Sequence, residues 1–229
     1  VVFDKASGKL KLAEEREGVV DMAYCGSSDN KDLFAYVTDK GAIYVQDREI
    51  KLNGKSKEKF RLACTDLDRD GVVDVIAVGS RGTVAAAGVV ESKKGLNWSK
   101  TYKRGSEGTS GLMHETSGIA MGDINGDGYP EIVFLGDNLV YALDRSGLPL
   151  GGFPVKITRG SPVYAFFSDP LLVDVNGDDT PEILVPSSDG IVYAYTGKGK
   201  SVNGQFPLAA GSLEMLDSTM VVQPMSLFV

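Results

Sequence analysis

Three stretches of this 229-residue chain share one pattern: DLDRDGVVDVIAV (66–78), DINGDGYPEIVFL (123–135) and DVNGDDTPEILVP (174–186). Each begins with Asp-x-Asp/Asn-x-Asp, carries an acidic residue at position 9, and continues into an apolar run rich in β-branched residues. Successive copies begin 57 and 51 residues apart. A pattern that returns at this spacing indicates a repeat architecture in which each copy marks one structural unit.

A second set of repeats follows the acidic windows. NLVYALDRSG (138–147) matches GIVYAYTGKG (190–199), with weaker copies at 41–47 and 82–88, and GLPLGGFPV (147–155) matches KSVNGQFPL (200–208). A unit therefore consists of strand, acidic loop, strand, turn, strand, Gly/Pro turn and strand. Four short strands in about 40–57 residues predict an all-β chain, a β-propeller of four-stranded antiparallel blades.

The repeats predict four blades with a half blade at each end. VVFDKASGKL (1–10) aligns with YALDRSGLPL (141–150), and QPMSLFV (223–229) resembles DPLLV (169–173), which leads into an acidic loop. We expect a single propeller domain over 1–229 that is part of a larger propeller; a five-bladed ring closed by the two half blades is the alternative. The expected blades are 20–56, 57–115, 116–165 and 166–215, the half blades are 1–19 and 216–229, and 91–116 is expected to be a long surface loop.

The net charge of −7 is concentrated in the windows 66–74, 123–131 and 174–182. They hold 11 of the 31 acidic residues and one of the 24 basic residues, which leaves the rest of the chain at +3. Acidity this local predicts sites for cations. There is no basic stripe and no apolar stretch of about 18–20 residues, so we expect neither a nucleic-acid partner nor membrane insertion of this chain.

The spacing within the windows suits calcium, which takes six to eight oxygen ligands, with carboxylates at alternate positions of a tight loop. EF-hands share this spacing but need Glu at position 12 and flanking helices, whereas position 12 here is Ala77, Phe134 or Val185 within a strand-like run. Solvated turns are the simpler alternative, which three copies in one register disfavour. We therefore expect three Ca²⁺ sites, with Val72, Tyr129 and Thr180 contributing carbonyl oxygens: Asp66, Asp68, Asp70, Val72 and Asp74; Asp123, Asn125, Asp127, Tyr129 and Glu131; Asp174, Asn176, Asp178, Thr180 and Glu182.

Position 6 of each window must turn the chain sharply. It is Gly71 and Gly128 in the first two windows but Asp179 in the third. Because aspartate tolerates a positive φ less well than glycine, we expect the third site to be the weakest.

The acidic windows resemble the FG-GAP/VCBS calcium-binding repeats of integrin α-subunit propellers and of many secreted bacterial proteins. The resemblance extends over nearly the whole chain, most strongly over about 57–215, and VYALDRSGLPLGGFPV (140–155) is similar to the bacterial branch. It implies that each loop joins the first and second strands of a blade and holds one Ca²⁺. Blade 1 has YCGSSDNKD (24–32) at the loop position, with only Asp29 and Asp32 retained, so we expect no metal there.

The function that the resemblance implies is extracellular binding, adhesion or scaffolding, either secreted or at the cell surface, with a periplasmic location also possible. The partner would be a protein or glycan ligand, or other chains of a larger assembly. The alternatives are a propeller-fold carbohydrate-active enzyme, such as a polysaccharide lyase or hydrolase, and a lectin in which Trp98 stacks on sugar. Because the clustered carboxylates are assigned to calcium and His114 is the only histidine, we expect no catalytic residues.

Two further sets of residues carry structural expectations. Cys25 and Cys64 lie near corresponding first strands of neighbouring blades, offset by about three residues; we expect two buried free thiols, with a disulfide as the alternative. Trp98 is expected to pack against its own loop, and the tyrosines at 44, 141 and 193 to pack in the core or between blades.

Overall fold

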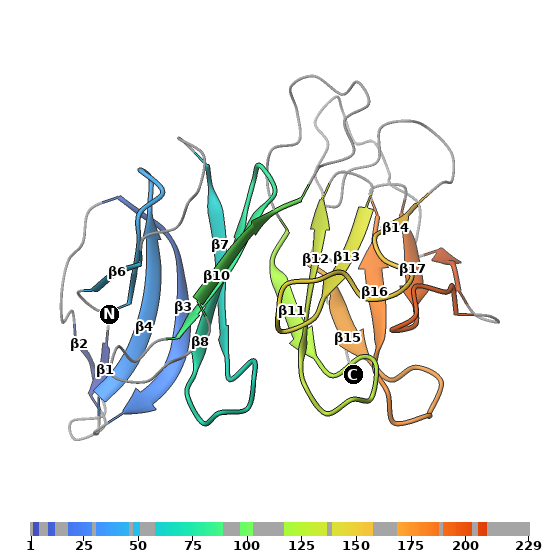
Figure 1. Cartoon of the computed structure of the whole chain (residues 1–229), viewed down its shortest axis with the longest axis horizontal. Helices are drawn as coiled ribbons and strands as arrows, with labels where there is room; N and C mark the ends of the chain where they lie inside the picture. The colour runs from blue at the N-terminus through green and yellow to red at the C-terminus, as the bar shows by residue number, and fades with distance from the viewer. Residues whose placement is uncertain are drawn as a thin grey trace.

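A computed structural model shows an all-β chain (Figure 1). It describes residues 2–4, 9–11, 18–28, 31–45, 48–50, 58–88, 97–102, 117–136, 139–157, 169–187, 190–202 and 206–209. Among these, none forms a helix with the length and apolarity that crossing a membrane would need. His114, Asp29 and the expected half blade 216–229 lie outside the described residues.

Four antiparallel sheets of four strands follow one another along the chain, each with its strands in sequence order. Their strands are β3 (Val19–Ser28), β4 (Lys31–Thr38), β5 (Ile43–Val45) and β6 (Arg48–Ile50); β7 (Phe60–Thr65), β8 (Asp74–Gly79), β9 (Thr83–Gly88) and β10 (Asn97–Thr101); β11 (Ile119–Gly122), β12 (Glu131–Gly136), β13 (Leu139–Leu143) and β14 (Val155–Lys156); β15 (Leu171–Val173), β16 (Glu182–Pro186), β17 (Ile191–Tyr195) and β18 (Leu208–Ala209). A hairpin of β1 (Val2–Asp4) and β2 (Lys9–Lys11) precedes them. The sheets are the blades of a β-propeller, numbered 1 to 4 below.

The blades pack face to face, and the period of two along each strand explains how. In β8, Val75 and Ala77 belong to the core shared with blade 1, whereas Ile76 and Val78 belong to the core shared with blade 3. A strand that is buried on both faces needs a continuous apolar run rather than an alternating one. This is why the apolar run after each acidic window is unbroken.

The second residue of each acidic loop packs into the next blade. Leu67 of blade 2 is buried in the core shared with blade 3 and is 0% exposed, and Ile124 of blade 3 is buried in the core shared with blade 4 and is 1% exposed. The equivalent residue of blade 4, Val175, is 38% exposed. In blade 1, the first of the four blades, Met22 and Tyr24 of β3 are 57% and 56% exposed. The outer faces of blades 1 and 4 thus resemble interfaces that lack a neighbour among the described residues.

Part of the segment expected to be a surface loop is a strand. Residues 97–101 form β10, which pairs with the alanine-rich β9. Trp98 contacts the neighbouring blade: its indole N–H donates to the Arg145 carbonyl of blade 3, at 2.9 Å, and its ring lies against Gly147. Most of the loop against which it is expected to pack, 91–96 and 103–116, lies outside the described residues. The polar composition of 91–116 concealed the strand, because β10 has only one large apolar side chain.

The expectation of free thiols is wrong, because Cys25 of β3 and Cys64 of β7 form a disulfide. Their Cα atoms are 5.0 Å apart, within the range that a disulfide spans. The two first strands lie side by side, so the bond joins blade 1 to blade 2. In blade 1 the segment that replaces an acidic loop is a hairpin, in which β3 extends to Ser28 and β4 begins at Lys31.

Candidate metal centres

Each acidic window forms the loop between the first and second strands of its blade. The loops 66–73, 123–130 and 174–181 join β7 to β8, β11 to β12 and β15 to β16, and all three lie along the lower edge of the molecule in Figure 1. Position 9 is the first residue of the second strand: Asp74, Glu131 and Glu182 are all buried. The fold therefore places one buried carboxylate beneath each exposed acidic loop.

Backbone N–H groups turn the first carboxylate of each loop inward. Asp66 accepts hydrogen bonds from the N–H groups of Asp70 and Gly71, at 3.1 and 2.9 Å. Asp123 and Asp174 accept the equivalent bonds in their own loops. In the third loop burial opposes ionisation, but four backbone donors outweigh it and hold the pKa of Asp174 below its usual range. The loop backbone is thus arranged to hold a negative charge at position 1.

Two positions of each loop have left-handed backbone conformation. Position 4 has φ of 58° at Arg69 and 77° at both Gly126 and Gly177. Position 6 has φ of 82° and 89° at the two glycines and 65° at Asp179, whose N–H donates to Asp174 at 2.9 Å. Asp179 therefore adopts the same turn as glycine, and a lower metal affinity of the third loop stays a prediction.

The first loop brings three carboxylates together around a buried oxygen that has no partner. Ligand oxygens of Asp66, Asp68 and Asp74 lie within 4.8 Å of one another. Oδ2 of Asp74 accepts the Leu67 N–H at 3.1 Å, but its Oδ1 is buried and has no hydrogen-bond donor among the described residues. Burial, and then the charges of the neighbouring aspartates, raise the pKa of Asp74 to about 6. A cation is the group that would satisfy this oxygen and offset the mutual repulsion.

The second and third loops satisfy the buried carboxylate with an asparagine. Nδ2 of Asn125 donates to Glu131 at 3.0 Å and to Asp127 at 3.2 Å, while its Oδ1 accepts the Asp127 N–H at 2.7 Å. Asn176 makes the same set of bonds in the third loop. Burial, and then the charges of Asp127 and Asp123, raise the pKa of Glu131 to about 7. This amide bridge between two acids was not predicted, because the spacing of the loop residues indicates only that asparagine can be a metal ligand.

Position 5 closes each loop. Oδ1 of Asp70 accepts the Val72 N–H at 2.7 Å, and Asp127 and Asp178 accept the N–H of Tyr129 and Thr180, each at 2.9 Å. The side chains at positions 1, 3, 5 and 9 thus belong to one connected cluster in each loop; position 3 is an aspartate in the first loop and an asparagine in the other two. The assignment of the position-7 carbonyls as ligands stays a prediction.

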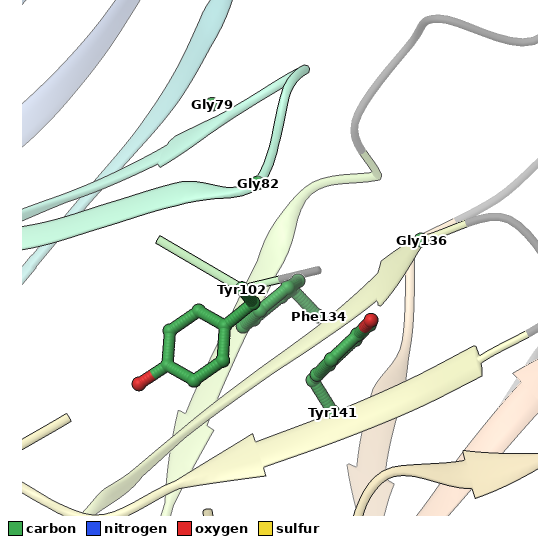
Figure 2. Close-up of a pocket in the computed structure, with 6 residues that line it drawn as sticks. All are labelled: Gly79, Gly82, Tyr102, Phe134, Gly136 and Tyr141. Atoms are coloured by element: carbon green, nitrogen blue, oxygen red, sulfur yellow. The ribbon is translucent and has the colours of Figure 1, made fainter. Parts of the chain in front are cut away.

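A small recess between blades 2 and 3 has a different character (Figure 2). It is lined by Gly79, Gly82, Tyr102, Phe134, Gly136 and Tyr141. The rings of Phe134 and Tyr141 stack at 4.8 Å between centroids, and the Tyr102 hydroxyl donates to the Gly147 carbonyl. Burial, and then the charge of Asp144, raise the pKa of Tyr102 to about 12, so its hydroxyl stays protonated. The lining contains no acid, and the recess is aromatic packing between blades.

A sequence profile of the FG-GAP-like repeat family matches residues 66–134 and 123–185, a span that contains all three acidic loops. The chain belongs to this family. The chain is similar to integrin alpha-7 of Rattus norvegicus and of Mus musculus. It is 30% identical to each over 158 residues, which cover 61% of this chain. The alignment covers 14% and 13% of these relatives, so this FG-GAP-like chain spans only a small part of their length.

Solved structures agree on the fold. The crystal structure of BBS1N in complex with ARL6DN, soaked with lead, superposes with a TM-score of 0.50 at 13% identity, over 83% of this chain and 56% of that chain. At this identity the likeness concerns the architecture alone. It agrees with the assignment of the four sheets as blades of a β-propeller.

Proposed function

We propose that this chain is a calcium-stabilised extracellular propeller module that binds or scaffolds other molecules and has no catalytic activity of its own. The observation that carries the calcium sites is Asp74, a fully buried carboxylate whose Oδ1 has no donor and which lies beside Asp66 and Asp68. Oxygen donors of this kind, in a loop that begins with alternating acids, fit calcium better than a softer metal.

The same donor positions occur in all three loops. The ligand set of the first site would be the carboxylates of Asp66, Asp68, Asp70 and Asp74 with the Val72 carbonyl. The other two sites would use the equivalent positions, with an asparagine in place of Asp68. In those loops calcium would take the place of the asparagine amide donor. The position-5 aspartate and the buried glutamate, which now accept hydrogen bonds from that amide, would then be ligands.

Calcium at these sites would stabilise the blades. A site with a Kd near ~10⁻⁴ M in ~1 mM calcium would contribute about 1.4 kcal/mol to the free energy of unfolding. Three such sites would be a large part of a typical net stability of about 5–15 kcal/mol. Sites of this affinity fill only where calcium is abundant, which supports an extracellular or periplasmic location.

The disulfide supports the same location. Cys25 and Cys64 are paired across a blade boundary, and disulfides persist in oxidising compartments rather than in the cytosol. The integrin relatives support a binding or adhesion role with a protein or glycan ligand, or with other chains of a larger assembly. The exposed Val175 and Met22 on the outer faces of blades 4 and 1 support a larger propeller in which further blades cover them.

The arrangement of the described side chains fits a binding role better than a catalytic one. Their clustered acids lie in the three loops, and the recess of Figure 2 brings together glycines and aromatic rings rather than an acid and a base. A lyase or hydrolase would need convergent titratable groups in such a recess. For this reason we favour binding over the alternative, a carbohydrate-active enzyme. Activity of the chain on acidic polysaccharides would favour the enzyme instead.

Calorimetric titration of metal-free protein with calcium tests the proposal. We expect three sites and a melting temperature that rises with calcium and falls with chelator. Asp66→Asn, Asp123→Asn and Asp174→Asn should each remove one site. Glu49→Gln, which neutralises an exposed acid on β6, should remove none. Absence of calcium-dependent heat, with a melting temperature indifferent to chelator, would show that the loops are only turns.

A further inference from the structure

Arg69 is the one residue at position 4 of the three loops that is not glycine. It has φ of 58°, where the equivalent Gly126 and Gly177 have 77°. A non-glycine residue in left-handed conformation costs about 1 kcal/mol or more, so such a residue is expected to have a compensating contact. The compensating contact is in the neighbouring blade.

The Arg69 side chain reaches the second acidic loop. Its guanidinium carbon is 6.0 Å from the centroid of the Tyr129 ring, and its Nη1 lies over Gly128, 3.9 Å from the place where a Cβ would stand. This is the distance range of a cation–π contact. Arg69 lies between two predicted ligands of the first site, Asp68 and Asp70, and Tyr129 is the predicted carbonyl ligand of the second.

The Tyr129 ring is also held from its own blade. The Arg145 guanidinium carbon is 3.8 Å from the ring centroid, and the Arg145 carbonyl accepts the Trp98 indole N–H of blade 2. Leu67, between Asp66 and Asp68, is buried in the core that blades 2 and 3 share. The loop that would bind one ion is therefore linked through side chains to the loop that would bind the next.

We propose that the Arg69–Tyr129 contact couples the calcium sites of blades 2 and 3, so that calcium bound in one loop raises the affinity of the other; this rests on the proposed function of both loops. Calcium fixes the backbone of the loop that it binds. Because Arg69 and Tyr129 must both be ordered to make their contact, an ion in one loop lowers the entropy cost of ordering the other. Coupling is reciprocal, so either ion can bind first.

The third loop provides an internal comparison. The second loop has Gly126 at position 4 and the third has Thr180 at position 7, so the next boundary has no equivalent of Arg69 or of Tyr129 at these loop positions. We expect the site of blade 4 to lack this coupling. The strength of an exposed cation–π contact corresponds to about a 2- to 5-fold change in affinity.

The experiment uses the whole chain with the third site disabled by Asp178→Ala, so that calcium titration follows two sites. We expect a Hill coefficient of about 1.2–1.4, which is what about 2- to 5-fold coupling gives for two sites. Arg69→Gly keeps the positive φ, as in the other loops, and Tyr129→Leu keeps the carbonyl; each should lower the coefficient to about 1.0. Lys100→Ala is the matched control, because Lys100 lies 5.9 Å over the Trp98 ring at the same boundary and belongs to β10 rather than to either loop.

The outcomes separate the coupling from the calcium sites themselves. Loss of cooperativity in both loop variants, with cooperativity kept in the control, supports the coupling. Two filled sites without cooperativity in the parent, or cooperativity that survives both variants, overturns the coupling and leaves the calcium sites in place. A parent that binds no calcium overturns both proposals.

Discussion

The substitution Asp68→Asn tests the physical difference between the first loop and the other two. In the second loop, Asn125 donates its Nδ2 hydrogens to Glu131 and Asp127, so the buried carboxylate is satisfied without metal. In the first loop the equivalent Asp68 has no hydrogen to donate, and Oδ1 of Asp74 is left without a partner. Asp68→Asn should introduce the amide bridge into the first loop.

The magnitude follows from the cost of the unsatisfied oxygen. A buried polar atom without its hydrogen bond costs about 1–3 kcal/mol, and a melting temperature moves by about 2–4 °C per kcal/mol for a chain of this length. The metal-free variant should therefore melt about 2–12 °C higher than the parent protein. The rise in melting temperature on adding calcium should shrink, since calcium no longer relieves an orphaned oxygen.

Differential scanning calorimetry in chelator and in saturating calcium measures both effects. Asn125→Asp is the reciprocal variant: it removes the donor to Glu131, so it should lower the melting temperature in chelator and increase the rise that calcium produces. If Asp68→Asn leaves the metal-free protein unchanged or less stable, the orphaned oxygen is not what distinguishes the first loop, and the argument from Asp74 fails.

Three further outcomes are expected. Burial raises the pKa of Asp74 to about 6 and of Glu131 to about 7, so the folded state binds more protons than the unfolded state at intermediate pH. Stability in chelator should therefore fall from pH 5 to pH 7.5, while the calcium-induced rise in melting temperature grows. Equal calcium effects at both pH values would contradict this. Ile124→Ala should lower the free energy of unfolding, measured in urea, by about 2–5 kcal/mol and Val175→Ala by less than about 0.5 kcal/mol. Among the described residues only Ile124 of the two is packed into another blade. Similar losses would mean that Val175 is packed as well. Asp179→Gly should raise the melting temperature in chelator, because glycine adopts its φ of 65° without strain, and a lower value would show that the aspartate side chain stabilises the turn.

The sequence was sufficient for the fold because the signals are local and repeated. An unbroken apolar run after each acidic window predicts a strand buried on both faces, and β8, β12 and β16 are such strands. β10 was missed for a physical reason. As the outermost strand of its blade it carries Ser99 and Thr101 on the surface, so its composition is that of a loop and only its pairing with β9 makes it a strand.

The site was predictable in outline but not in its interactions. The acid spacing places the three loops correctly between first and second strands. The amide bridge of Asn125, the insertion of Leu67 into the next blade and the contact of Arg69 with Tyr129 depend on three-dimensional neighbours that spacing does not reveal. The disulfide was misjudged for the same reason, because the offset between two strands of different blades is set by blade packing.

Neighbouring blades are joined at each of the three boundaries by different contacts, which lie near the edge that carries the acidic loops. At the boundary of blades 3 and 4, Ile124 is buried in the shared core and the Gly197 backbone lies against its carbonyl. At the boundary of blades 2 and 3, Leu67 and the Arg69–Tyr129 contact link the two loops.

At the first boundary there is no acidic loop to supply such a residue. Cys25 lies in the segment 24–32 that stands in place of the loop, and its partner Cys64 is two residues before Asp66, the first acid of the acidic loop of the next blade. Among the three boundaries between the described blades, the covalent bond thus occurs at the one where the preceding blade has no acidic loop. A propeller whose blades are held by neighbouring faces needs a contact at every boundary, and in this chain a disulfide provides one where the preceding blade has no acidic loop.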